Sequence, residues 1–169
     1  MGSRARASAG SERVSSITNR TAAIRHATVD DVLDVVAIER DSFGDPWPER
    51  SFGELAASRA AIFLIATLGE TNAIAGYVIA LTVADQAEIL NLAVARSARR
   101  QGLGGDLLDA GISAVAARGA REIFLEVRES NKAALGLYGS RGFAALARRS
   151  RYYRNPVEDA LVLKRAVER

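Results

Sequence analysis

Two side chains capable of acid–base chemistry stand at positions where the surrounding sequence is apolar. Glu126 lies in the middle of residues 123–127, Ile-Phe-Leu-Glu-Val, which read as a buried or half-buried strand. An ionised carboxylate is costly there unless it is paired or faces a cleft. Glu126 is therefore either an ion-pair partner of Arg128 or Arg121, or a base in a site. Tyr138 lies on the apolar stripe of a short predicted helix, and it is either a core aromatic with a satisfied hydroxyl or a functional phenol.

Residues 91–108 carry a different signal, an apolar strand followed by a basic, glycine-containing turn and then an amphipathic helix. The glycines at 102, 104 and 105 remove Cβ atoms, so the backbone can approach a ligand closely. The N–H groups of the first helical turn lack partners within the helix, and the helix dipole adds positive charge at the same end. Arg99 and Arg100 add two full charges. The segment therefore predicts a site for a phosphate or a similar anion.

The rest of the sequence predicts the elements that position these residues. Runs of apolar and β-branched residues predict strands, whereas Thr28, Pro48 and the Ser130-Asn131 pair mark the beginnings of helices. The predicted strands span residues 24–27, 62–68, 73–83, 87–95, 121–128, a segment from 143 onward and 157–165. A helix at 102–118 joins two of these strands by a crossover of the length that connects parallel neighbours. We therefore expect an α/β (α+β) fold with about four helices and a mixed central sheet of six to seven strands, antiparallel and then parallel.

The composition limits the chemistry that is available. The chain has 169 residues, no cysteine and one histidine, His26. These counts exclude a disulfide scaffold, a multi-histidine metal centre and a covalent thioester on the enzyme. We expect no metal, and we expect His26 to be a structural residue of the first strand. No apolar run is long enough to span a membrane, and the absence of cysteine fits a reducing compartment, so the expected location is the cytoplasm.

The chain divides into two regions of different composition. Residues 1–22 are rich in Ser, Ala and Arg with almost no large apolar side chain, so we expect a disordered arm there. Residues 23–169 are expected to form one domain, because this length suffices to bury a core. The net charge is +3, and basic residues gather at 4–25, 96–100 and 148–154. Such clusters bind phosphate or nucleic acid, or are simply solvated.

Several segments in the same order along the chain resemble the GNAT superfamily of N-acetyltransferases. Residues 99–104, Arg-Arg-Gln-Gly-Leu-Gly, resemble its Arg/Gln-x-x-Gly-x-Gly/Ala pyrophosphate motif, and they lie between a strand and a helix as that motif does. Residues 125–131 and 134–143 resemble the downstream segment of the superfamily, and residues 39–47 upstream and 151–153 downstream complete the combination. The combination is most similar to the RimI type, the bacterial ribosomal-protein alanine N-acetyltransferases, over about residues 24–165. The sequence departs from the pattern at Gly105, where a polar or basic residue is often found, and in the unusual pair Gly136 and Gly139.

The resemblance implies acetyl-CoA as the acyl donor, with direct attack by an amine in a ternary complex. Backbone amides of residues 100–105 would hold the diphosphate, and the pantetheine arm would lie where the fourth and fifth strands splay. The residues implied to bind acetyl-CoA are Leu92, Ala93, Val94, Arg99, Arg100, Gln101, Gly102, Leu103, Gly104, Gly105, Asn131 and Tyr138. Asn131 also suits a helix cap, and the two roles are compatible. Glu126 is implied as the catalytic base and Tyr138 as the acid for the departing thiolate.

The substrate implied by the resemblance is the N-terminal alanine of a small-subunit ribosomal protein. Trp47, Tyr152 and Tyr153 are its candidate groove residues, although Trp47 also suits a hydrophobic staple before the second helix. We expect no membrane partner and no direct contact with nucleic acid. The alternatives are acetylation of an internal lysine or a small-molecule amine, and a non-catalytic acyl-CoA-binding or RNA-binding module that uses residues 148–154.

Overall fold

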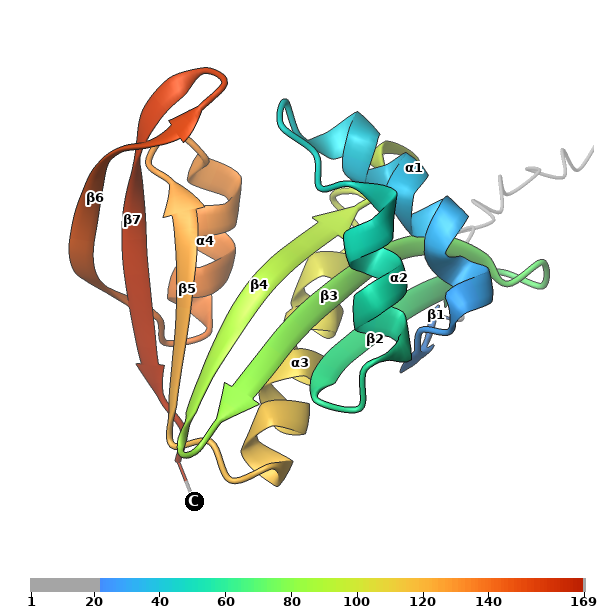
Figure 1. Ribbon diagram of the computed structural model, residues 1–169, viewed down its shortest axis with the longest axis horizontal. Helices are drawn as coiled ribbons and strands as arrows, with labels where there is room; N and C mark the ends of the chain where they lie inside the picture. Colours follow the sequence, from blue (N-terminus) through green and yellow to red (C-terminus); the bar gives the residue numbers. More distant parts are fainter. Residues whose placement is uncertain (1–21, 169) are drawn as a thin grey trace, which may run out of the picture.

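The computed structural model describes residues 22–168, which fold around one seven-stranded sheet in the order β1-β2-β3-β4-β5-β7-β6 (Figure 1). The strands are β1 (Ala22–His26), β2 (Ala61–Leu68), β3 (Ala73–Val83), β4 (Gln86–Val94), β5 (Glu122–Arg128), β6 (Ala144–Arg154) and β7 (Val157–Ala166). The helices are α1 (Val32–Ser42), α2 (Glu49–Ala57), α3 (Leu103–Ala117) and α4 (Lys132–Ser140). The predicted mixed α/β fold is confirmed.

The two halves of the sheet separate at the junction of β4 and β5. These strands pair in parallel over only four residues, from Gln86 opposite Glu122 to Ile89 opposite Leu125. One extra residue, Leu90, then interrupts the register between β4 and β3, and such a bulge bends the strand that carries it. Figure 1 shows β4 and β5 diverging beyond this point. The predicted splay between the fourth and fifth strands is therefore present.

The C-terminal half of the sheet is more antiparallel than the sequence pattern indicates. β4 and β5 form its one parallel pair among residues 22–168, because β7 runs antiparallel to both β5 and β6. β7 also lies between β5 and β6, although β6 comes first in the chain. The last two strands are therefore a hairpin whose second strand is added to the sheet, and β6 becomes the exposed edge.

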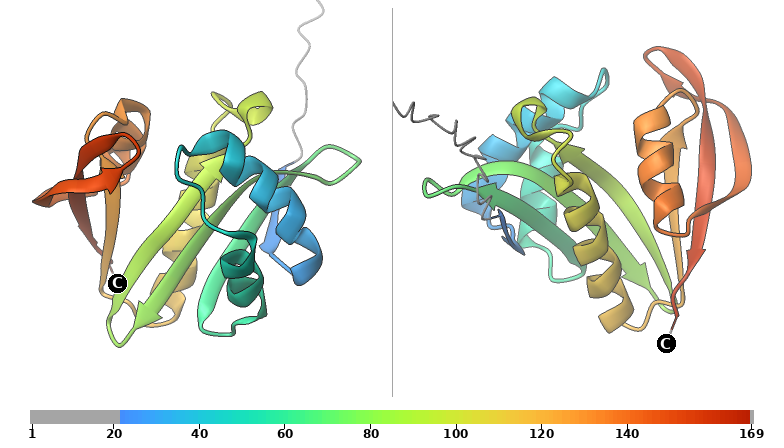
Figure 2. Two further views of the ribbon diagram at one scale, coloured as in Figure 1. Left: turned by 45° about the horizontal axis from the view of Figure 1, so that its top comes forward. Right: turned by 180° about the vertical axis from the view of Figure 1, so that it is seen from behind.

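Helices cover both faces of the sheet. α1 and α2 pack on one face, where their apolar stripe meets Phe63, Ile65 and Tyr77 in a buried cluster. α3 packs on the opposite face against β2, β3 and β4, and α4 lies beside it next to β5 (Figure 2). The apolar positions of α3 that were predicted to form one face are buried, with Leu107, Leu108 and Val115 fully covered.

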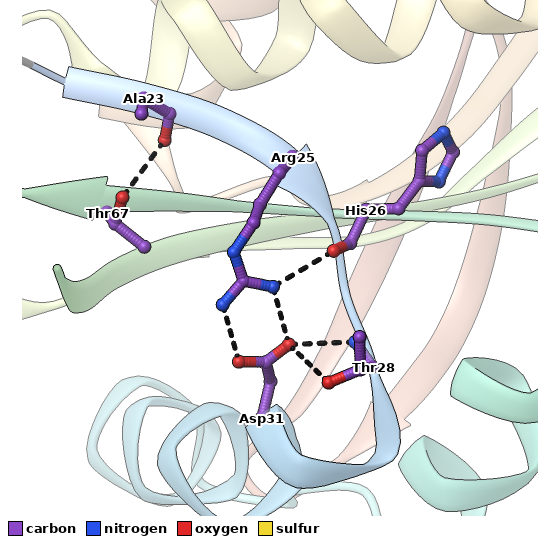
Figure 3. Close-up of polar contacts among 6 residues, drawn as sticks. All are labelled: Ala23, Arg25, His26, Thr28, Asp31 and Thr67. Atoms are coloured by element: carbon purple, nitrogen blue, oxygen red, sulfur yellow. Dashed lines mark hydrogen bonds and ion pairs between the residues drawn. The ribbon is translucent and has the colours of Figure 1, made fainter.

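The predicted helix start at Thr28 caps a short 3-10 helix, η1 (Val29–Asp31), that leads directly into α1, and a small polar network stabilises it (Figure 3). The backbone N–H of Thr28 donates to Asp31 Oδ2 at 2.7 Å, and the two terminal nitrogens of Arg25 donate to the two Asp31 oxygens at 2.8 Å. These bonds, with the Arg25 guanidinium as the largest cause, lower the pKa of Asp31 to about 2. His26 is the last residue of β1 and thus lies in the first strand, as predicted, with its side chain exposed.

Three other expectations concern the N-terminal arm, membrane-spanning segments and metal sites. The expected disordered arm lies outside the described residues except for Ala22, which is the first residue of β1. Among residues 22–168, no helix is both long and apolar enough to cross a membrane. Within the same range, no three His, Cys, Asp or Glu side chains are grouped so that they could hold a metal ion.

Candidate active site

A cleft of about 740 Å³ opens where β4 and β5 part. Its floor comes from residues 89–92 of β4 and 126–128 of β5, and α4 supplies one wall. The α1–α2 loop and the tip of the β6–β7 hairpin form its two lips, which touch where Asn155 Nδ2 donates to the carbonyl oxygen of Gly44 at 3.1 Å. Predicted site residues that line the cleft are Trp47, Leu92, Glu126, Asn131, Tyr138, Tyr152 and Tyr153.

Glu126 faces this cleft from β5 and is held by residues of β6. Its Oε1 lies 3.0 Å from Arg149 Nη1, and its side chain is 17% exposed. The predicted ion-pair partners, Arg128 and Arg121, are therefore wrong. The register explains the difference: because β7 lies between β5 and β6, Arg149 comes to lie two strands away from Glu126. The carboxylate is thus both paired and open to the cleft.

Arg128 has a different role, since it braces the hairpin. It forms an ion pair with Glu158 at 3.2 Å and donates to the carbonyl oxygens of Asn155 and Pro156. Its guanidinium also lies 4.2 Å from the ring centroid of Tyr153. These contacts hold the β6–β7 tip over the cleft.

Tyr138 is 8% exposed and reaches the cleft from α4. Its ring packs edge-on against Phe143 at 5.8 Å, so the predicted core packing is present. Within residues 22–168 its hydroxyl makes no hydrogen bond, which leaves a donor at the cleft. Burial, followed by repulsion from Tyr153, raises the pKa of Tyr138 to about 12.

Aromatic side chains line the lips of the cleft. Tyr152 and Tyr153 stack edge to face at 5.2 Å on the hairpin. A hydrogen bond from Tyr152 to Glu126 raises the pKa of Tyr152, and burial together with the Glu126 charge raises the pKa of Tyr153 to about 12. On the other lip, Trp47 packs against Phe52, four residues into α2, at 5.9 Å. Trp47 is therefore both the predicted staple and a wall of the cleft.

Glu39 is a cleft residue whose role the sequence pattern did not assign. It is 1% exposed, and its Oε1 accepts the backbone N–H of Trp47 at 2.9 Å. Its Oε2 accepts the Tyr77 hydroxyl and, at 3.1 Å, Asn91 Nδ2. Burial and the Glu39 charge raise the pKa of Tyr77 strongly, so that hydroxyl stays a donor. The available signal was a carboxylate on the apolar stripe of α1, at helical spacing from Val32 and Val35.

The glycine-rich turn adopts the backbone that an anion site needs. Gly102 caps α3 with φ +84°, and Arg100 before it also lies in the left-handed region with φ +60°. The first backbone bond of the helix runs from Asp106 N–H to Gly102 O at 3.1 Å. The N–H groups of residues 103–105 therefore remain available at the helix N-terminus.

Arg99, at the start of the turn, hydrogen-bonds to two oxygens of the protein. Its Nε donates to Val94 O at 2.9 Å and its Nη2 to Ser42 Oγ at 3.1 Å, so it ties the end of β4 to α1. The turn residues do not line the 740 Å³ cleft. They are connected to it through α4, because a Cβ at Gly104 would lie 3.5 Å from Leu137, which lines the cleft. The predicted cap is confirmed nearby, where Asn131 Oδ1 accepts Ala134 N–H at 3.1 Å.

Comparison with known proteins agrees with this arrangement. The model of the acetyltransferase (GNAT) family matches residues 32–143. A [ribosomal protein bS18]-alanine N-acetyltransferase of Escherichia coli strain K12 is 36% identical over 128 residues, which cover 75% of this chain and 84% of that protein. The crystal structure of the corresponding Escherichia coli enzyme superposes with a TM-score of 0.80 at 31% identity, covering 88% of this chain and 95% of that one.

A more distant structure, NAA60 of Arabidopsis thaliana in complex with acetyl-CoA, superposes with a TM-score of 0.79 at 18% identity and shares the fold. It covers 87% of this chain and 100% of that one. Members of the GNAT family use acetyl-CoA.

The basic residues proposed for an RNA-binding module are partly neutralised in this structure, since Arg148 pairs with Glu129 and Asp159, and Arg149 with Glu126. With its split sheet, its glycine-capped turn and its match over residues 32–143, the chain belongs to the GNAT family and is an acetyltransferase.

Proposed function

We propose that this acetyltransferase transfers the acetyl group of acetyl-CoA to the N-terminal α-amine of a protein. The proposed substrate is the N-terminal alanine of a small-subunit ribosomal protein. The observation that carries the proposal is the cleft between β4 and β5, which Glu126 of β5 and Tyr138 of α4 both line. The named activity of the Escherichia coli relative supports the choice of substrate.

The residues present fit acetyl-CoA. The left-handed Gly102 and the available N–H groups of residues 103–105 suit its diphosphate. The opening between β4 and β5 leaves backbone groups of residues 92–94 without a β5 partner, because pairing stops at Ile89. These groups would bind the pantetheine arm and stabilise charge on the thioester oxygen. Acetyl-CoA supplies an acetyl group on a good leaving thiol.

Glu126 is suited to remove a proton from the incoming amine. An amine attacks only when it is neutral, and an α-amine with a pKa near 8 is roughly one-tenth neutral at pH 7. A lysine with a pKa near 10.4 is neutral in only about four molecules in ten thousand. One carboxylate, positioned by Arg149 at 3.0 Å and reached from the cleft, is therefore adequate for an N-terminus, directly or through water.

Tyr138 is better suited to hydrogen bonding than to full proton transfer. With its pKa raised to about 12 by burial, protonating a thiolate whose thiol has a pKa near 8.5 is uphill by about 5 kcal/mol. A hydrogen bond from the phenol to the developing thiolate charge avoids that cost and gains strength as the charge grows. Tyr138 then stabilises the leaving group, and solvent completes the protonation.

The lips of the cleft fit an extended chain end. Trp47 on one side and the Tyr152–Tyr153 pair on the other provide flat apolar surfaces, and the Asn155 contact with Gly44 joins the two lips. A peptide would enter end first, so that its α-amine reaches Glu126.

The decisive experiment incubates the protein with acetyl-CoA and a matched peptide panel, followed by mass spectrometry. The panel contains a peptide with a free N-terminal alanine and an internal lysine, the same peptide with its N-terminus blocked, and a small-molecule amine. We expect one acetyl group on the free N-terminus alone. Acetylation of the blocked peptide or of the small amine, with the free N-terminus unmodified, would overturn the proposal.

A further inference from the structure

An arginine from outside α3 fills the space beside the first turn of that helix. Gly105 is the third residue of α3 and is buried. A Cβ atom at this position would collide with Arg141 Nη2 and would lie 3.0 Å from Arg141 Cζ. The neighbouring atoms belong to the planar head of the guanidinium, so any larger residue at position 105 would displace it. The absence of a side chain at Gly105 therefore leaves the space that the Arg141 guanidinium occupies.

The Arg141 side chain is held in place at this position. Arg141 follows the last residue of α4, and its Nε and Nη2 donate to the two Asp109 oxygens at 3.2 and 3.3 Å. Its Nη1 donates to Ser140 Oγ at 2.9 Å. The side chain is 29% exposed, so part of the guanidinium reaches solvent. Three of its five N–H groups are used in this way, which leaves one on each terminal nitrogen.

The position of this cation matters because the first turn of α3, residues 103–106, contains no basic side chain of its own. The guanidinium of Arg99 already hydrogen-bonds to Val94 O and Ser42 Oγ. Arg141 instead lies against the turn whose N–H groups at 103–105 are available. A guanidinium with free N–H groups on both terminal nitrogens matches the geometry of phosphate oxygens.

We propose that Arg141 binds a phosphate group of acetyl-CoA and that Gly105 is small in order to admit it. This inference rests on the proposed function, because it takes acetyl-CoA as the ligand of the α3 turn. Gly105 stands where a polar or basic residue is often found in the family pattern, and Arg141 brings a basic group to the same space from the end of α4. A purely structural role, in which Arg141 only joins α4 to Asp109 of α3, is the competing explanation.

The test is calorimetric titration of the full chain with acetyl-CoA, 3′-dephospho-CoA and S-acetylpantetheine. We expect Arg141→Ala to raise the Kd for acetyl-CoA about tenfold to a hundredfold, the range for a charge-assisted hydrogen bond. Binding of S-acetylpantetheine, which has no phosphate, should not change. A loss that persists with 3′-dephospho-CoA assigns the contact to the diphosphate, and a loss confined to acetyl-CoA assigns it to the 3′-phosphate.

Two further variants separate phosphate binding from a structural role. Asp109→Asn weakens the bridge between the helices but keeps the cation, so acetyl-CoA affinity should be retained or increased. Adding Gly105→Arg to Arg141→Ala returns a cation to the same space from α3 and should restore most of the affinity. If Arg141→Ala does not fold, Arg141→Gln keeps much of the stem and carries the same expectation.

Equal losses of affinity in Asp109→Asn and Arg141→Ala would overturn the inference, as would an unchanged Kd in Arg141→Ala while the wild type binds acetyl-CoA. Failure of the wild type to bind acetyl-CoA would instead refute the proposed function.

Discussion

Replacing Glu126 by Gln keeps the size of the side chain and removes the carboxylate that faces the cleft. In the wild type, Arg149 lies 3.0 Å from this carboxylate. In the proposed mechanism, the carboxylate takes the proton from the bound ammonium group within the complex. The wild-type rate should then change little between pH 6 and pH 9. The Gln variant has no such acceptor, so it must capture substrate molecules whose α-amine is already neutral.

The size of the effect follows from the amine. With a pKa near 8, an α-amine is about 1% neutral at pH 6, about one-tenth neutral at pH 7 and about 90% neutral at pH 9. The activity of the variant should therefore rise about tenfold from pH 6 to pH 7 and about fivefold from pH 7 to pH 8. The ratio of wild-type to variant kcat/KM should fall nearly a hundredfold between pH 6 and pH 9.

The assay measures CoA release with a peptide that has a free N-terminal alanine, across this pH range. Glu88→Gln is the matched control, because Glu88 lies on β4 opposite Phe124, and its pKa is raised by burial and then by Glu126. This control removes the same charge from the neighbouring strand and should keep the wild-type profile. Parallel profiles for wild type and Glu126→Gln, or the same loss in Glu88→Gln, would refute the assignment of Glu126 as the proton acceptor.

Three further outcomes are expected. Tyr138→Phe should lower kcat about tenfold to a hundredfold while the Kd for acetyl-CoA stays the same, and a thioester with a more acidic leaving thiol should recover much of the loss; a changed Kd with an unchanged kcat would contradict the role at the leaving group. Glu39→Ala should leave the buried Tyr77 hydroxyl and the Trp47 backbone N–H without their acceptor, which lowers the free energy of unfolding in urea by roughly 3 kcal/mol. The same change should raise the KM for peptide but not for acetyl-CoA. A loss of less than about 1 kcal/mol in the free energy of unfolding would show that these groups find other partners. Asp31→Asn removes the bond pair with Arg25; because the pKa of Asp31 is lowered from 3.8 to about 2, that stabilisation is complete above about pH 4 and disappears as the pH falls toward 2. Since Arg25 is 48% exposed and therefore screened by solvent, the loss at pH 7 should be only about 1 kcal/mol, and a difference from wild type that persists at pH 2 would contradict this reasoning.

The sequence by itself determined the features that depend on near neighbours along the chain. Hydrophobic periodicity located each strand and helix to within a few residues, and Thr28 and Asn131 marked helix starts that the structure confirms. The glycine-rich turn between β4 and α3 was recognisable because its chemistry lies within a few residues. Glu126 and Tyr138 were conspicuous because each carries a polar group in an apolar segment.

Only the tertiary structure decided which distant groups meet. The insertion of β7 between β5 and β6 brings Arg149 to Glu126 and places the tyrosine pair on the cleft, and no local pattern specifies the order in which strands of a sheet pair. The burial of Glu39 against Tyr77 depends on how α1 lies across β3, which is a matter of packing between layers. The position of the Arg141 guanidinium beside Gly105 also depends on packing, because α4 must end next to the first turn of α3. Short segments of sequence determine local structure and local motifs. A site built from five elements exists only once long-range packing has fixed their relative positions.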